Sequence, residues 1–587
     1  MNCFRRVKTA LLAIPERNKT LILSLVVGVV AGLAAVVLEE CIALVKHLVD
    51  HFTNATSFNW LYLVTPGIGM LLSMLLVKYV VRDNIGHGVT KVLLAISRNE
   101  SKIRPHNMWS SLPTSALTIG FGGSVGAEAP IVYTGAAIGS NFARYMGLSY
   151  KNMTIMLGCG AAAAVAGIFK APLAGLLFTM EILLFNISMS SMLPLMLAAI
   201  SATVVAYIFR GQDLPFQCAL TPFSMGNIPF YMILGVVGGF GSLYFSRVTL
   251  WLEDKLGAWK SRVRKCILCA ISIGVLIFLF PMLYGEGYGS LSGLLNSMPI
   301  EEYGGNTLLG GMLDSGLGVV AFFVLVFLFK VVAMTLTNAG GGVGGTFGPT
   351  LFEGAILGFV VARTLNLIGF DVPEQNFALV GMAAMMSGVM QAPMTAIFLI
   401  AEVTGGYELL VPLILASAIS FGTTRIFEKY SIYAKRIAQS GDLLTHDNDQ
   451  AVLTLLKTSD LVRDKYPRVS VDASLGEVVR IIADSTAAVF AVVDDEDHFK
   501  GLVDIDTARS FMFKTHQYKT LHVSDFMQSP AEFIYLDEPM TSVMRKFDRT
   551  GAWRLPVIGQ DRKYYGFISR SRLLSAYREE LKIISQD

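Results

Sequence analysis

Charged side chains are scarce in this sequence. Asp, Glu, Lys and Arg make up only 16% of its 587 residues, whereas hydrophobic residues make up 53%. Soluble domains carry about 25% charged residues, so the composition excludes an ordinary soluble protein. The net charge is only +3 and no part of the chain is strongly basic, which argues against a nucleic-acid-binding protein. We therefore predict an α-helical polytopic membrane protein with a more polar part attached.

Cysteine and histidine are also few, with six and eight residues. Cys266 and Cys269 form a C-x-x-C pair, but no second pair follows at the spacing of a zinc site. Most cysteines lie in or beside apolar runs, where a thiol behaves as a small hydrophobic group. The histidines form no H-E-x-x-H motif and no close His–Asp set. The sequence thus predicts no metal site, no cofactor and no enzyme activity.

A cleavable signal peptide is not expected either. The N-terminal region has no small-residue cleavage site at the usual distance. Five cationic residues precede the first long apolar run: Arg5, Arg6, Lys8, Arg17 and Lys19. By the positive-inside rule, we expect the N-terminus in the cytoplasm, the first helix retained, and the protein in the plasma (inner) membrane.

Long apolar segments fill the chain from Thr20 to Phe421. Several are interrupted by Gly, Pro or Ala-Pro, and some are shorter or longer than the roughly 20 residues that cross the hydrocarbon. Broken and tilted helices are the expected result. Charges become frequent beyond Tyr430. We therefore predict a transmembrane domain over residues 1–440 and a cytoplasmic domain over residues 441–587.

Two stretches in the apolar part match each other without gaps. GAAAAVAGIFKAPLAGLLFTME begins at Gly160, and GMAAMMSGVMQAPMTAIFLIAE begins at Gly381. Upstream of each lies a Gly-x-x-x-Pro turn, Gly126–Pro130 and Gly345–Pro349. Duplicated halves with breaks at corresponding positions predict a transporter fold with its binding site at the breaks.

The polar part contains a second repeat. LGEVVRIIADSTAAVFAVVDDEDHFKGLV begins at Leu475, and MTSVMRKFDRTGAWRLPVIGQDRKYYGFI begins at Met540. Each copy has the pattern of a helix, a strand, a turn and a second strand. The polar part is therefore predicted to be a tandem α/β module.

Three glycine-rich segments stand where a broken helix could restart: GHGVT at Gly86–Thr90, GAEAP at Gly126–Pro130 and GGTFGP at Gly344–Pro349. The unpaired N–H groups of a first helical turn, together with the helix dipole, hold an anion without a full positive charge. A full charge would bind the ion too tightly for release. One such segment alone is more often a packing turn; three, two of them at matching points of a repeat, favour an anion pathway.

These segments resemble the motifs of the CLC family of chloride channels and chloride/proton exchangers, which read GSGIP, GREGP or GKEGP, and GxFxP in this order. The family's tyrosine near the end of the membrane domain matches Tyr433 in SIYAKR. The tandem module from Val469 to Tyr577 resembles the cytoplasmic pair of CBS modules that many members carry. The resemblance covers nearly the whole chain and implies duplicated halves with broken helices, plus a CBS pair.

The resemblance also implies a function for individual residues. Glu128 would be the gate, a carboxylate that competes with chloride for the pathway. The backbone amides of Thr346 and Phe347 and the hydroxyl of Tyr433 would bind the central ion. The expected partners are chloride and other small anions, the lipid bilayer, and a second copy of the chain in a homodimer.

Each of these residues also has a purely structural interpretation. Glu128 could be a protonated buried side chain that joins two helices. Phe347 could be a core aromatic residue, and Tyr433 could belong to the aromatic belt at the membrane interface.

The first two motifs depart from the family pattern. His87 stands where the family usually has Ser, and Thr90 where it usually has Pro. Either the His87 ring coordinates the ion, or it turns away and only the backbone amide of Gly88 remains. Ala127 stands where Arg or Lys is common, which removes one positive charge near the pathway.

A third departure concerns coupling to protons. Proton-coupled members usually carry an inner glutamate directly after another glutamate, but here Glu181 is followed by Ile182, which cannot carry a proton. The repeat matches Glu181 with Glu402, which suggests a structural role for both. We therefore predict a passive chloride channel, with a chloride/proton antiporter as the alternative.

The CBS pair departs from the pattern of adenine-nucleotide sites, whose final Asp holds the ribose. Thr507 occupies that place in the first copy and Arg572 in the second. Binding of an adenine nucleotide is therefore doubtful, and the pair is expected to modulate the channel or to stabilise its dimer.

Overall fold

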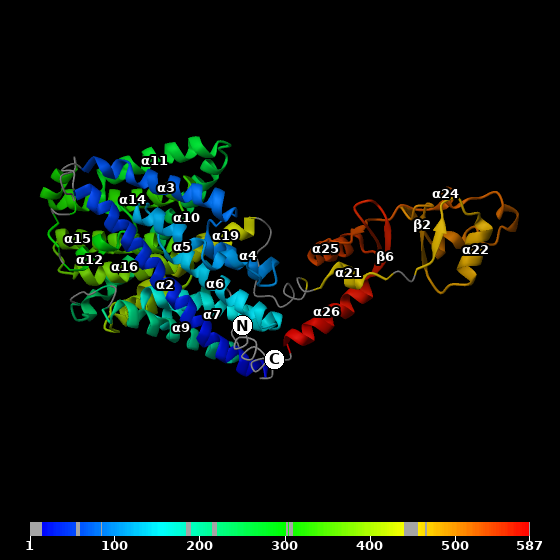
Figure 1. Cartoon of the computed structure of the whole chain (residues 1–587), viewed down its shortest axis with the longest axis horizontal. Helices are drawn as coiled ribbons and strands as arrows, with labels where there is room; N and C mark the ends of the chain where they lie inside the picture. The colour runs from blue at the N-terminus through cyan, green and yellow to red at the C-terminus, as the bar shows by residue number, and fades with distance from the viewer. Residues whose placement is uncertain are drawn as a thin grey trace, which may run out of the picture. The chain divides into compact units, whose positions relative to one another are not determined.

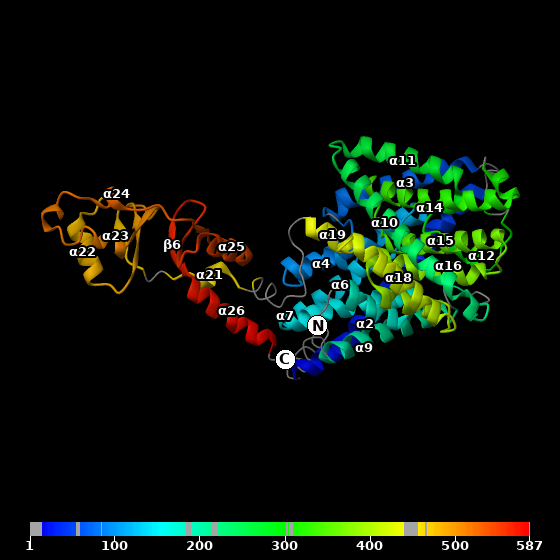
Figure 2. The same cartoon turned by 180° about the vertical axis from the view of Figure 1, so that it is seen from behind.

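The computed structural model describes residues 15–54, 59–83, 85–183, 189–213, 216, 220–296, 298–300, 303, 309–439, 453, 456–463 and 466–585. Figures 1 and 2 show the chain from opposite sides. It divides into two compact units, Met1–Leu443 and Leu444–Asp587, and each is described by itself. Arg5, Arg6 and Lys8 lie outside the described residues, so the predicted orientation stays a prediction. Two of the six cysteines, Cys3 and Cys218, lie outside them as well.

The first unit is built from helices joined by short loops (Figure 1). Among the described residues, eight helices are long and apolar enough to cross a membrane. In chain order, the helices are α2 (Glu16–Asn54), α3 (Thr65–Leu76), α4 (Gly88–Arg98), α5 (Ser111–Gly120), α6 (Glu128–Tyr145), α7 (Tyr150–Phe169), α8 (Pro172–Ile182), α9 (Met189–Arg210), α10 (Ile228–Gly257), α11 (Arg262–Leu279), α12 (Tyr288–Leu295), α14 (Gly316–Ala339), α15 (Phe347–Ile368), α16 (Glu374–Met390), α17 (Pro393–Val403), α18 (Leu410–Phe427) and α19 (Ile432–Gln439).

The predicted broken helices are confirmed. The apolar segment from Met153 to Leu184 is split into α7 and α8, and that from Phe377 to Val403 into α16 and α17. The backbone turns at Lys170 and Gln391, which occupy matching places of the repeat and share the left-handed conformation, with φ of 54° and 53°. A proline lies in the first turn of each new helix, where its missing N–H leaves no hydrogen bond unmade.

Glu181 and Glu402 each cap a helix of the other half. The Glu181 carboxylate accepts hydrogen bonds from the N–H groups of Met394 (3.0 Å) and Thr395 (2.7 Å) at the start of α17. The Glu402 carboxylate accepts from Leu173 (3.0 Å) and Ala174 (2.8 Å) at the start of α8. This exchange satisfies N–H groups that have no partner within their helices, and it gives both carboxylates a structural role.

The two halves also meet at their Gly-x-x-x-Pro turns. Gly126 N–H donates to Gly345 O (3.1 Å), and Gly345 N–H donates to Gly126 O (2.7 Å). Close helix contacts repeat in the same way, α6 against α7 at Gly160 and α15 against α16 at Gly381. A Cβ atom at either glycine would collide with a backbone carbonyl of the neighbouring helix. The duplication predicted from sequence is therefore a duplication of structure, with α6 and α15 as equivalent helices.

The second unit contains two copies of one small α/β module. The strands are β1 (Arg468–Ser470), β2 (Val489–Val493), β3 (Phe499–Asp504), β4 (Ile534–Tyr535), β5 (Arg554–Ile558) and β6 (Tyr564–Ser569). The helices are α21 (Thr458–Leu461), α22 (Leu475–Ala483), α23 (Ile505–Arg509), α24 (Val523–Phe526), α25 (Met540–Thr550) and α26 (Arg570–Ser585). Each three-stranded sheet has one parallel and one antiparallel pair, in the orders β1-β2-β3 and β4-β5-β6. The predicted tandem module is thus confirmed.

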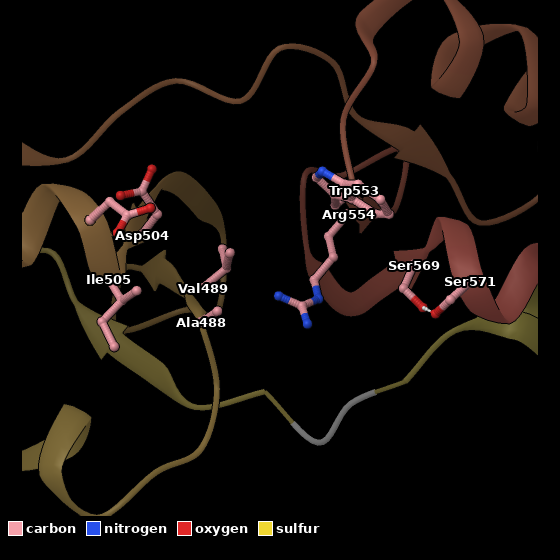
Figure 3. A pocket seen from close by; sticks show the side chains of 9 residues that line it. Ala488, Val489, Asp504, Ile505, Trp553, Arg554, Ser569 and Ser571 are labelled. Carbon is pink, nitrogen blue, oxygen red and sulfur yellow. Dashed lines mark hydrogen bonds between the residues drawn. The ribbon is translucent and has the colours of Figure 1, made fainter.

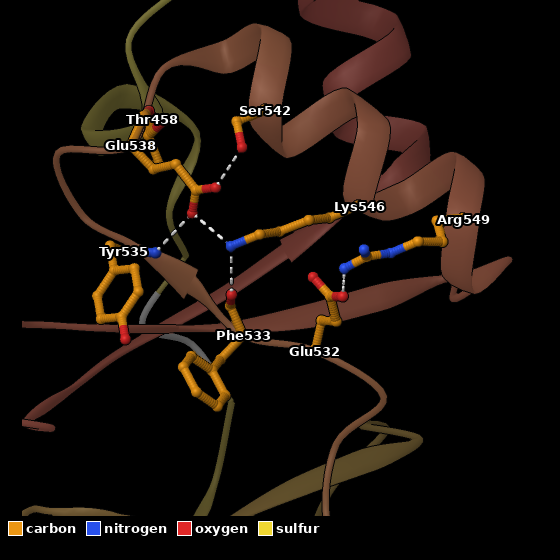
Figure 4. Close-up of polar contacts among 8 residues, drawn as sticks. All are labelled: Thr458, Glu532, Phe533, Tyr535, Glu538, Ser542, Lys546 and Arg549. Atoms are coloured by element: carbon orange, nitrogen blue, oxygen red, sulfur yellow. Dashed lines mark hydrogen bonds and ion pairs between the residues drawn. The ribbon is translucent and has the colours of Figure 1, made fainter.

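A polar network fixes α25 to β4 in the second module (Figure 4). The Glu538 carboxylate accepts hydrogen bonds from Lys546 Nζ (2.8 Å), Ser542 Oγ (2.6 Å) and the Tyr535 N–H (3.0 Å). Burial alone would raise the pKa of Glu538, but these hydrogen bonds outweigh it, so the pKa lies below its ordinary value of 4.5. The matching place in the first module is Ala473, so this network belongs to the second module alone.

Candidate anion site

Glu128 is the first residue of α6 and is 1% exposed. Its carboxylate accepts a hydrogen bond from the Tyr288 hydroxyl and a second one, of 3.2 Å, from the Gly348 N–H. Gly348 lies in the first turn of α15. The carboxylate therefore lies at a positive helix end, where an anion would otherwise be held. Because these partners suit a charged carboxylate, Glu128 needs no lysine or arginine beside it.

The start of α15 also brings together the predicted ion-binding residues. Thr346 precedes the helix, and its hydroxyl donates to the Tyr433 hydroxyl (3.1 Å) from α19. Both side chains are buried. The Phe347 ring packs between Phe169 and Phe178, with ring centroids 5.5 and 6.0 Å away, so its side chain belongs to the core. The N–H groups of the first turn remain the part of this segment that suits an anion.

The His87 side chain points toward Glu253 and Arg436, and Arg436 lies on α19, the helix that also carries Tyr433. His87 precedes α4 in the left-handed conformation (φ 55°). Its Nε2 lies 3.8 Å from Oε1 of Glu253 on α10, and Glu253 in turn forms a 2.5 Å ion pair with Arg436 of α19. Gly88 packs so closely on α6 that a Cβ atom would meet the carbonyl of Ala129. Of the two alternatives for the first motif, this geometry favours the one in which the backbone of Gly88 faces the ion.

Ile182 ends α8 as a buried apolar residue, 4% exposed. The carboxylate of its neighbour Glu181 accepts hydrogen bonds from the first N–H groups of α17. Ile182 has no ionisable group, and the Glu181 carboxylate is already hydrogen-bonded. Neither residue therefore offers an unbonded carboxyl group.

Sequence reasoning missed Tyr288, although its hydroxyl is one of the two donors to Glu128. Tyr288 opens α12 within the segment YGEGYG, and Gly287 precedes it with φ of 91°. The available signal was a fourth glycine-rich segment at the start of a helix, one that has no proline and no counterpart in the repeat.

The sequence model of the family described as voltage gated chloride channel matches residues 68–425, well over half of the chain. This chain belongs to the CLC family. Its CLC fold of apolar helices makes it an integral, multi-pass membrane protein, and its function is CLC-type chloride transport. The CBS domain model matches residues 459–513 and 523–579. CLC proteins are channels and transporters rather than enzymes.

Known CLC proteins resemble the chain over most of its length. The putative chloride channel protein ClcB-like of Ralstonia nicotianae is 26% identical over 434 residues, 71% of this chain and 96% of that protein. The H(+)/Cl(-) exchange transporter ClcA of Salmonella paratyphi B is 26% identical over 420 residues, 68% and 85%. The solved structure of a eukaryotic CLC transporter has a TM-score of 0.58 and 17% identity, covering 94% of this chain and 97% of that one. That likeness shows the fold.

The CBS pair of this CLC protein encloses a cleft of about 340 Å³ (Figure 3). Asp504 lines one side and Arg554 points into the space from the other. The two residues at the ribose position have other partners. The Thr507 hydroxyl accepts a hydrogen bond from Gln528 (2.7 Å), and the Arg572 guanidinium donates to the carbonyl of Asp460 (3.3 Å). The cleft thus lacks a ribose carboxylate at these places.

Metal binding finds no support in the part of the chain that the structure describes. No three His, Cys, Asp or Glu side chains are grouped there so as to hold an ion. Cys266 and Cys269 are buried free thiols on α11.

Proposed function

We propose that this CLC protein is a passive chloride channel in which Glu128 is the gate. The observation that carries the proposal is the position of the Glu128 carboxylate at the start of α15, where it accepts the Gly348 N–H. Ionised, Glu128 fills the place of an anion and closes the pathway. Protonated, or displaced by chloride, it gives up these donors and the pathway opens.

The anion would be held mainly by backbone dipoles. The N–H groups of Thr346 and Phe347 at the start of α15 and that of Gly88 at the start of α4 are the proposed donors, joined by the Tyr433 hydroxyl. Partial charges of this kind bind chloride weakly enough for it to leave. The His87 ring, close to Glu253, would act on selectivity only indirectly.

Passive conduction is favoured over proton exchange by Ile182. A coupled exchanger must bring a proton to Glu128 without opening a free path for chloride. The position usually used for that proton is apolar and buried here, and the adjacent Glu181 caps α17. The chloride/proton antiporter is the second candidate, because several similar proteins are named exchange transporters.

We further propose a homodimer in the plasma (inner) membrane, with the N-terminus and the CBS pair in the cytoplasm. The CBS pair would modulate gating or stabilise the dimer. These assignments follow from the family and from the cationic N-terminal residues, by the positive-inside rule.

Chloride and proton fluxes measured together in liposomes containing the purified full-length protein test the proposal. The expected result is a chloride flux whose reversal potential follows chloride alone, with no uphill proton movement. Uphill proton movement driven by a chloride gradient, and abolished by Glu128→Ala, would replace the channel by the antiporter. A protein that carries no chloride would refute the proposed function as a whole.

A further inference from the structure

A group of ionisable side chains beside Glu128 has no part in the proposed function. It consists of Glu286, which precedes α12, Lys330 on α14 and Glu353 on α15. Lys330 and Glu353 are completely buried, whereas Glu286 is only partly buried. Ionisable groups within a membrane protein are costly and usually mark a pathway for ions or protons.

The segment from Gly285 to Tyr288 joins this group to the gate. Glu286 Oε1 accepts a hydrogen bond from the N–H of Ala127 (2.9 Å), the residue directly before Glu128. Two residues later, Tyr288 donates to the Glu128 carboxylate itself. At the other end of the segment, Lys330 Nζ donates to the carbonyl of Gly285 (3.0 Å). A change of charge on Glu286 therefore changes the electrostatic potential at Glu128.

The charges of the group do not balance. Three carboxyl groups, those of Glu128, Glu286 and Glu353, share one ammonium group, that of Lys330. Lys330 is attracted by both Glu286 and Glu353, and Glu286 is close enough to Glu128 to be repelled by it. Neither oxygen of Glu353 has a hydrogen-bond partner among the described residues. Since an unpaired buried charge costs several kcal/mol, the three carboxyl groups cannot all be charged beside one ammonium group, and at least one of them holds a proton.

Other charged or titratable groups that face this pair of acids are few. Lys46 on α2 and Arg210 on α9 act on Glu286. Lys46 is exposed to water, and Arg210 forms an ion pair with Glu39, so both positive charges are balanced elsewhere. The hydroxyls of Tyr288 and Tyr433 face Glu128.

We propose that Glu286 is the proton donor and acceptor of Glu128. The proton leaves the Glu286 carboxyl group, Glu128 takes it up and releases its hold on α15, and water restores the proton to Glu286. The Glu286 carboxylate left behind is stabilised by Lys330. This inference rests on the proposed gating role of Glu128, and it supplies the gate with a proton from an acid other than the one missing at Ile182.

A purely structural role for Glu286 makes a different prediction. As a cap, Glu286 only has to accept the Ala127 N–H, and the amide oxygen of glutamine accepts the same bond. Glu286→Gln therefore keeps the cap and removes the proton. Glu286→Asp keeps an acid, and Glu374→Gln, which removes a carboxylate paired with Arg363 outside the group, serves as the matched control.

The first measurement is chloride efflux from liposomes containing the full-length protein, across a range of external pH. Two interacting acids titrate in two steps, so the unmodified protein is expected to show a two-step profile. Glu286→Gln should show a single step, shifted to more acidic pH by about one unit, because Glu128 no longer has a negative neighbour that favours its protonation. Glu286→Asp and Glu374→Gln should keep both steps. A Glu286→Gln profile identical to that of the unmodified protein overturns the inference.

The second measurement does not depend on transport. Infrared absorption of protonated carboxyl groups is recorded on the purified protein during a pH titration, and the spectra of the variant with both Glu128→Gln and Glu286→Gln are subtracted to remove the other acids. The difference should fall in two steps. Glu286→Gln and Glu128→Gln should each remove one step. If the protein carries no chloride, the proposed function fails while this titration still decides on the proton pair. If Glu286→Gln leaves both steps in place, only the inference about Glu286 fails.

Discussion

The two halves of the membrane unit start equivalent helices with different residues. Relative to the paired glycines Gly126 and Gly345, α6 opens with Glu128 and α15 opens with Phe347. By contrast, Glu181 and Glu402 are identical at matching places, and each caps the other half. Residues that the halves share hold them together, whereas residues that differ serve a task for which one copy is enough. Differences between the halves thus point to the transport pathway.

The largest effect is expected from substitutions at the close helix contacts that both halves share. Gly160→Ala and Gly381→Ala place a Cβ atom against a backbone carbonyl of the neighbouring helix, which cannot move aside. Overpacking of this kind costs about 3 kcal/mol. Both variants should lose thermal stability to a similar extent, measured by the unfolding temperature in detergent. Gly422→Ala, with open space around its Cβ atom, is the control and should be neutral or stabilising. A tolerated Gly381→Ala would contradict the equivalence of the two contacts.

The next largest effect is expected at Glu128, which differs from Phe347 at the matching place of the other half. Glu128→Gln removes the charge that competes with chloride at α15. Hydrogen bonds to a charged group contribute about 1.5–3 kcal/mol, so chloride flux at neutral pH should rise at least about tenfold and lose its dependence on pH. Phe347→Leu, at the matching place, should leave the pH dependence intact. Unchanged flux and pH dependence in Glu128→Gln would reduce Glu128 to a packing residue.

A smaller effect is expected at the shared caps. Glu181→Ala and Glu402→Ala each leave two N–H groups without a partner, which costs about 1 kcal/mol. The two variants should be destabilised equally in thermal unfolding, with the ratio of chloride to proton flux unchanged. If Glu181→Ala alone altered proton movement, the symmetry of the pair would not describe its function, and Glu181 would be a proton carrier.

The CBS pair allows the same comparison between copies. Thr507 and Arg572 occupy matching places, and neither supplies the carboxylate that usually holds the ribose. Calorimetry with ATP on the full-length protein should therefore show binding no tighter than about 1 mM, or about 4 kcal/mol. Arg572→Asp and Thr507→Asp restore the missing acid and should strengthen binding if the rest of the cleft suits a nucleotide. Micromolar binding by the unmodified protein would contradict this interpretation.

The smallest effect is the pH dependence of the contact between β4 and α25 in the second module. Because the pKa of Glu538 is lowered in the folded state, its contacts stabilise α25 fully above pH 4.5, and this stabilisation disappears as the pH falls through the lowered value. The contribution is at most about 1 kcal/mol, since the Glu538–Lys546 pair lies near the surface, with 11% and 18% of the two side chains exposed, and solvent screens the charges. Hydrogen exchange, corrected for intrinsic rates, should show α25 losing protection in acid. Helix α22 lacks this contact but has an acidic cap of its own, Glu477, whose pKa is also lowered, so Glu538→Gln is the reference for α25. Glu538→Gln should abolish the part of the pH dependence of α25 that comes from this contact.

The sequence alone predicted both duplications because each copy keeps its spacing, with Gly and Pro at the breaks. It also predicted the place of Glu128, since a lone acid in an apolar stretch requires an explanation. Tyr288 and Glu286 escaped prediction because their partners lie about 160 residues away in the chain. The direction of the His87 ring was equally out of reach, since it depends on a Glu253–Arg436 pair that forms only when α10 and α19 meet.

The paired hydrogen bonds between Gly126 and Gly345 bear on the origin of this architecture. Each glycine gives and receives one bond, so the pair is its own image under a half-turn. A contact of this kind forms equally well between two separate, identical chains and is the usual basis of a symmetric dimer. An ancestor half as long could thus have assembled from two copies through this junction. Joining the copies into one chain left the junction intact and freed Glu128 and Phe347 to diverge.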